Sequence, residues 1–102
     1  MAEDFQVAVQ RLLTQVGHWE TGRWGVAAGE GTRGDLVYAL VQRLADYAAD
    51  AENRPRRAVP REPDMILPDQ LKVMTDDLLA ADPAPELLDQ AVDNVIQIRN
   101  SL

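Results

Sequence analysis

The stretch TRGDLVYALVQRLADYAADAE, from Thr32 to Glu52, carries the longest helical pattern in the chain and decides the fold. It opens like a capping box, in which the side chains of Thr32 and Asp35 each accept a hydrogen bond from the other residue's backbone N–H. The apolar side chains that follow recur on a stripe roughly 140° wide at about 100° per residue: Leu36, Val37, Leu40, Val41, Leu44, Tyr47, Ala48 and Ala51. A stripe this wide predicts a central helix with more than one neighbour.

Three further helical patterns surround this one, so we expect helices over about 2–16, 33–52, 68–81 and 85–101. The first helix has an apolar face and is expected to end at Gly17. Val7 lies off this face and is expected to be exposed or to contact a partner. The third opens with Pro68, because proline suits the first turn of a helix. The pattern predicts an all-α chain in which residues 1–102 form a single small four-helix bundle. The last two helices should be antiparallel, because the connection between them is short.

A Gly/Trp-rich loop over residues 17–32 joins the first two helices. It contains both tryptophans, the only histidine and five of the six glycines. A tight hairpin around Thr21-Gly22 would place Trp19 opposite Trp24. We favour the alternative, an irregular loop whose tryptophans cover one end of the bundle.

An Arg/Pro-rich linker over residues 53–67 joins the second and third helices. Pro55, Pro60 and Pro63 forbid a continuous helix, so the segment is expected to be extended, exposed and flexible. A connection this long is unusual in a bundle. It is therefore a candidate for a role beyond joining helices.

Composition narrows the functional classes. The net charge of −7 argues against binding to nucleic acid or to an anionic membrane surface, and no stretch approaches the ~20 apolar residues of a membrane span. The chain has no cysteine, which excludes disulfides and thiolate sites and favours a cytoplasmic location. One histidine and one serine, His18 and Ser101, leave little material for catalysis or a zinc site. We therefore expect neither an enzyme nor a bound metal or cofactor.

The Gly/Trp-rich loop is the candidate ligand site. Residues 29–34 match G-x-G-x-x-G, and free backbone amides before a helix can hold an anion. The match lacks the preceding strand and the parallel sheet of a dinucleotide fold, so it predicts at most a looser anion site. The candidate ligand-binding residues are Trp19, Trp24, Gly31, Thr32 and Arg33.

The linker and the last helix supply the candidate partner-binding residues. Four arginines stand within residues 54–61, which contain no acid. The apolar arc of the last helix covers roughly half its circumference, which can close within the chain or leave a strip for a homodimer. The candidates are Arg54, Arg56, Arg57, Arg61, Ile96 and Ile98. We expect a non-enzymatic adaptor or regulatory module that binds another protein or a second copy of itself, with a homodimer slightly favoured. The alternative is a protein that binds a small ligand or anion through the Gly/Trp-rich loop.

Overall fold

The computed structural model describes residues 4–102, and the chain is mostly helical and compact. The elements follow one another as α1 (Phe5–Val16), α2 (Thr21–Trp24), β1 (Ala27–Ala28), β2 (Gly31–Thr32), α3 (Arg33–Ala51), the short 3-10 helix η1 (Asp64–Ile66), α4 (Leu67–Ala80) and α5 (Pro85–Ser101). The all-α prediction is confirmed at this level. Residues 2 and 3, where the first helix was expected to begin, lie outside the described part of the chain.

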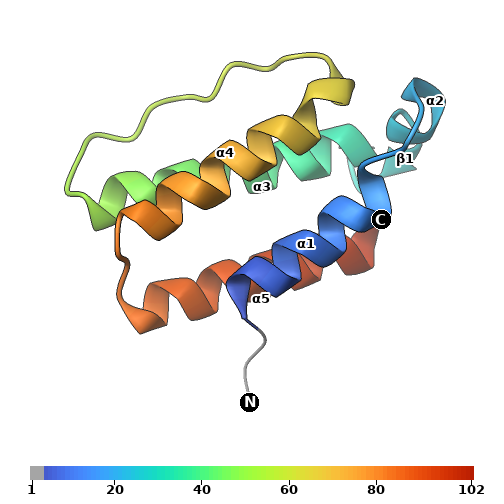
Figure 1. The fold of residues 1–102 in the computed structure, drawn as a ribbon. Coiled ribbons are helices and arrows are strands. Elements are labelled where there is room, and N and C mark those ends of the chain that lie inside the picture. Colours follow the sequence, from blue (N-terminus) through green and yellow to red (C-terminus); the bar gives the residue numbers. More distant parts are fainter. Residues whose placement is uncertain (1–3) are drawn as a thin grey trace.

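The four long helices lie in two pairs that run in opposite directions (Figure 1). α3 and α4 run side by side in the same direction and share the most extensive contact of any two elements. α1 and α5 also run parallel to each other, with α5 packed on α3 and α1 packed on α4. α5 runs antiparallel to α4, as the short connection predicts. Because α3 and α4 are parallel, the chain must return along the whole length of α3 between them.

The helix ends follow from the residues that the sequence places there. Asp4 caps α1 by accepting a hydrogen bond from the backbone N–H of Gln6. The predicted capping box of α3 is present, with Thr32 and Asp35 bonded to each other in both directions. Pro85 opens α5, and α4 begins at Leu67, one residue earlier than expected.

The core lies between the two helix pairs and draws on every long helix. Val37, Leu40, Val41 and Leu44 of α3 are buried, as the stripe predicted, whereas Ala51 at its end is exposed. Val7 is 45% exposed, which confirms its place off the buried face of α1. α3 and α5 pack against each other within the chain, so the first of the two outcomes expected for their wide apolar arcs is observed.

The Gly/Trp segment, residues 17–32, is not the irregular loop that we expected. Residues 21–24 form the short helix α2, so the hairpin considered around Thr21-Gly22 is wrong. A two-stranded hairpin does occur, but its turn lies eight residues later, where Ala27 pairs with Thr32 and Ala28 with Gly31. Gly29 turns it with a φ of 60°, a conformation that favours glycine.

Residues 53–63 form an extended segment that we call the strap, which runs back along α3 toward the start of α4 (Figure 1). Its extended course was predicted from the prolines. The linker predicted over residues 53–67 is extended only as far as residue 63, because residues 64–66 form η1 and Leu67 begins α4. It is also not exposed throughout, because Val59 is only 7% exposed, Leu67 is fully buried, and both belong to the hydrophobic core.

Candidate functional site

The middle of the strap is held to α3 by the side chains of Tyr38 and Gln42. The amide of Gln42 makes two hydrogen bonds to the strap backbone: its oxygen accepts from the N–H of Val59 at 2.7 Å, and its nitrogen donates to the carbonyl of Arg57 at 3.0 Å. The hydroxyl of Tyr38 donates to the carbonyl of Val59. These side chains satisfy hydrogen-bonding groups of the strap backbone, as a neighbouring strand would. They also place the Val59 side chain in the core.

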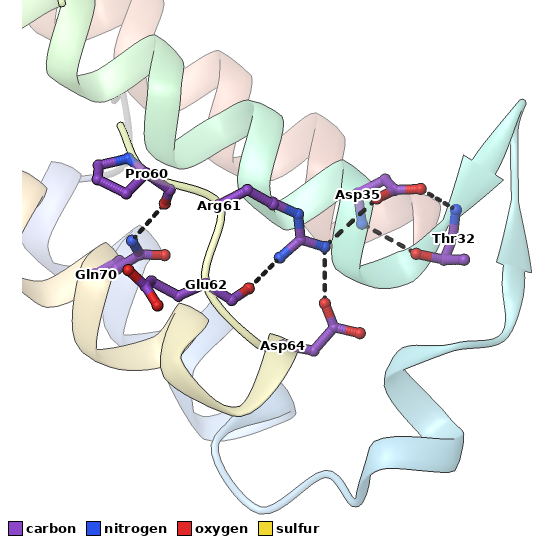
Figure 2. A network of polar contacts seen from close by, with 7 residues as sticks. All are labelled: Thr32, Asp35, Pro60, Arg61, Glu62, Asp64 and Gln70. Carbon is purple, nitrogen blue, oxygen red and sulfur yellow. Dashed lines mark hydrogen bonds and ion pairs between the residues drawn. The ribbon is translucent and has the colours of Figure 1, made fainter. Parts of the chain in front are cut away.

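Arg61 fastens the end of the strap, as Figure 2 shows. Its guanidinium donates to Asp64 at 2.7 Å, to Asp35 at 3.4 Å and to the carbonyl of Glu62 at 2.8 Å. Its guanidinium carbon also lies 5.1 Å from the ring centroid of Tyr38, within cation–π range. Arg61 therefore joins the strap, the start of α3 and η1 at one point.

Asp35 is the acid that links this point to the Gly/Trp segment. One carboxylate oxygen accepts from the N–H of Thr32 at 3.0 Å, and the other accepts from Arg61. The hydrogen bond from the Thr32 backbone, followed by that from Arg61, holds the pKa of Asp35 below its ordinary value. For Arg61, burial lowers the pKa, but the hydrogen bonds to Asp64 and Asp35 together outweigh burial and raise it.

The other three arginines of the strap are held less firmly. Arg56 pairs with Asp50 at 2.7 Å and Arg54 with Glu52 at 2.9 Å, and in both pairs each side chain is at least 42% exposed. The hydrogen bond from Arg56 lowers the pKa of Asp50. Arg57 is exposed, and within residues 4–102 its side chain makes no ion pair or hydrogen bond. Of the four predicted partner-binding arginines, it alone has a side chain without an ion pair or hydrogen bond among the described residues.

The predicted tryptophan site is part of the core. Trp19 and Trp24 are 5% and 1% exposed, and their rings meet edge to face with centroids 5.0 Å apart. The guanidinium carbons of Arg33 and Arg23 lie 5.2 Å and 5.7 Å from the Trp19 ring centroid. Both indoles belong to the hydrophobic core, and their role in covering one end of the bundle stays a prediction.

The amides predicted to hold an anion already have partners inside the chain. The N–H of Thr32 donates to Asp35, that of Asp35 to the Thr32 hydroxyl, and that of Arg33 to the carbonyl of Val26. The carboxylate of Asp64 packs against Gly34, where a Cβ would collide with it. Gly31 pairs with Ala28 in the hairpin. Two carboxylates thus stand where an anion would approach, which disfavours an anion site at these residues.

Ile96 and Ile98, predicted to contact a partner, are half-buried and pack against the core. Two residues apart on a helix, they differ by roughly 200° in direction. Buried residues of α5, including Ala91 and Val95, lie between them. The structure therefore places them at opposite edges of one buried face and does not bring them together in a patch.

Sequence reasoning missed Tyr38, Gln42, Val59 and Asp64, which together with Arg61 position the strap. Val59 had a visible signal, since it is an apolar residue flanked by prolines and arginines. Tyr38 and Gln42 lie four apart at the edge of the apolar stripe of α3, a spacing that puts both on one side of a helix. Nothing in the sequence pairs these two residues with Val59, because that contact depends on α3 and α4 being parallel.

Comparison of the chain with protein-family models, with curated proteins and with solved structures gave no match. Within the described residues, no cluster of three or more His, Cys, Asp or Glu is arranged to hold a metal ion. No helix of residues 4–102 has the length and apolar character that crossing a membrane requires.

Proposed function

We propose that this chain is a non-enzymatic, cytoplasmic protein-binding module that docks an acidic segment of its partner on the strap, through Arg54, Arg56 and Arg57. The observation that carries the proposal is the state of Arg57. Its guanidinium is exposed and lacks an ion pair among the described residues, although the chain is rich in acids. A carboxylate of the partner would give Arg57 the ion pair that it lacks within the described residues.

The neighbouring ion pairs support the proposal because they are easily exchanged. Exposed pairs contribute only about 0–1 kcal/mol, so Arg54 and Arg56 can leave Glu52 and Asp50 for a partner's carboxylates at little cost. Arg61 is different, since two carboxylates and the Tyr38 ring hold it in place. We assign Arg61 a structural role and leave it out of the docking surface.

The strap also offers its partner a fixed shape. Side chains of α3 hold its backbone at Arg57 and Val59, and Pro55 restricts the chain between these contacts and α3. A preformed extended segment loses less conformational entropy on binding than a flexible one. The underlying four-helix bundle is part of this proposal, with its helices acting as the support for the strap.

The test is a charge reversal at Arg57 with a matched control at Arg43, an exposed arginine of α3 that is not part of the strap. The probe is a fluorescent peptide of alternating glutamate and alanine, titrated with the full chain at several salt concentrations. We expect binding that weakens with salt and falls at least tenfold in Arg57→Glu but little in Arg43→Glu. Equal losses in both variants would show only a response to net charge and would overturn the proposal, as would no binding to wild type.

A homodimer remains a prediction of the sequence. α5 and the residue that follows it keep several large apolar side chains half-buried rather than buried: Leu87, Leu88, Ile96, Ile98 and Leu102. Light scattering over a concentration series checks it, and a strict monomer would remove it. The alternative ligand site in the Gly/Trp segment has less support, because its tryptophans are buried and its amides are hydrogen bonded.

A further inference from the structure

An open cavity of about 210 Å³ lies between the strap and the two parallel helices. Its α3 wall is made of three alanines: Ala45, Ala48 and Ala49. Met74 and Asp77 of α4 also line it, and residues of the strap between Arg54 and Pro60 form a further side. At about 30 Å³ per water, the cavity has room for roughly seven waters, or for a small organic molecule.

The strap is anchored to α3 at both ends of this space. The N–H of Arg54 donates to the carbonyl of Ala49, and the Gln42 side chain holds the strap backbone at Arg57 and Val59. Pro55, between these anchors, keeps the segment from coiling into a helix.

The residues around the cavity define the chemistry of its occupant. The α3 wall is apolar and lacks side-chain hydrogen-bonding groups, so it suits an apolar body. Two of the three charged residues that line it are arginines of the strap, and one of these, Arg57, has no ion pair within residues 4–102. Asp77, on the α4 side, would repel an anion, so an acidic group is favourable only toward the strap.

We infer that this cavity binds a small apolar carboxylic acid, with its hydrocarbon part against the alanines and its carboxylate toward Arg57. The site differs from the Gly/Trp segment and needs no protein partner. A variant that fills the cavity removes the site for the acid but leaves the outer surface of the strap intact. The inference and the proposed docking function are therefore separately testable.

The experiment titrates the full chain with hexanoate and follows backbone amide signals by two-dimensional NMR. We expect saturable shifts centred on Ala45, Ala48 and Ala58. Ala45→Leu places a larger side chain in the cavity and should reduce affinity at least tenfold. Ala39→Leu, an equal change at an exposed position of α3, should leave affinity within twofold of wild type. A urea midpoint for Ala45→Leu near that of wild type shows that the variant is folded.

Two analogues test the charge assignment. Hexanamide has a similar shape without the charge and should bind at least tenfold more weakly than hexanoate. Hexylammonium carries the opposite charge and should bind more weakly still. Equal binding of hexanoate and hexanamide, tighter binding of hexylammonium, or unchanged hexanoate binding in folded Ala45→Leu would each overturn the inference. An Ala45→Leu variant that fails to fold is replaced by Ala48→Val, for which the same outcomes hold.

Discussion

The two long connections of this protein, the Gly/Trp segment and the strap, are held in place in opposite ways. The Gly/Trp segment turns back on itself and buries two indoles, so large apolar side chains hold it. The strap stays extended and buries only Val59, so hydrogen bonds from α3 hold its backbone. The first arrangement stabilises the molecule and leaves its amides and indoles occupied. The second buries little apolar surface and leaves charged groups exposed.

The largest expected effect lies in the Gly/Trp segment. Trp24→Ala removes the largest fully buried side chain of the described structure and should lower the free energy of unfolding by about 3–5 kcal/mol. Urea denaturation followed by circular dichroism measures the change. Val26→Ala, at a residue that is 42% exposed, is the control and should stay within about 0.5 kcal/mol of wild type. A loss below about 1 kcal/mol for Trp24→Ala would show that the buried indole does not hold this segment in place.

The next effect tests whether burial contributes to holding the strap. Val59→Ala should lower the free energy of unfolding by about 2 kcal/mol, because it removes two buried methyl groups and leaves a space beneath the strap. The matched control is Val73→Ala on α4, where the side chain is 52% exposed and the change should be small. If both variants behaved alike in urea denaturation, the strap would be held by its hydrogen bonds alone.

Two glycines should respond with opposite signs. An alanine at Gly22 meets no atom within 4 Å, so Gly22→Ala should stabilise the protein by about 0.4–1 kcal/mol through the unfolded state. At Gly34 the new methyl group collides with the Asp64 carboxylate that Arg61 holds, and Gly34→Ala should destabilise by about 1 kcal/mol. Thermal denaturation measures both. Removal of the carboxylate by Asp64→Ala should abolish the penalty, and a penalty that persists would place its cause elsewhere.

The smallest effect is the pH dependence carried by Asp35, the residue that contacts both connections. Its folded-state pKa is lowered, so its contribution to stability is present above the unfolded pKa of about 3.9 and is lost as the pH falls through the folded value. Asp35→Asn keeps an oxygen for the Thr32 N–H but does not titrate. Its stability should therefore change less than that of wild type between pH 5 and the acid limit, the interval set by these pKa values. Urea denaturation measures the free energy of unfolding of both proteins across this interval. If it changed equally with pH in wild type and in Asp35→Asn, the pH dependence would not come from Asp35.

The local elements were largely predictable from the sequence, because they depend on neighbours along the chain. The Thr32–Asp35 cap, the buried stripe of α3 and the proline that opens α5 each need only a few consecutive residues. The parallel course of α3 and α4 brings together residues that are far apart in the sequence: Val59 and Gln42 lie 17 residues apart, and Arg61 and Asp35 lie 26 residues apart. No local pattern encodes these contacts. The hydrogen bonds of Gln42 and Tyr38 to the strap were therefore missed.

The parallel placement of α1 and α5 has a consequence for the protein under load. The start of α1 and the end of α5 lie at opposite ends of this helix pair (Figure 1). A force that pulls these two points apart acts along both helix axes and slides one helix past the other. Contacts loaded in shear share the force and fail together, whereas contacts loaded at one end open one at a time. Pulled at these two points, the protein should unfold in a single step rather than open one contact after another.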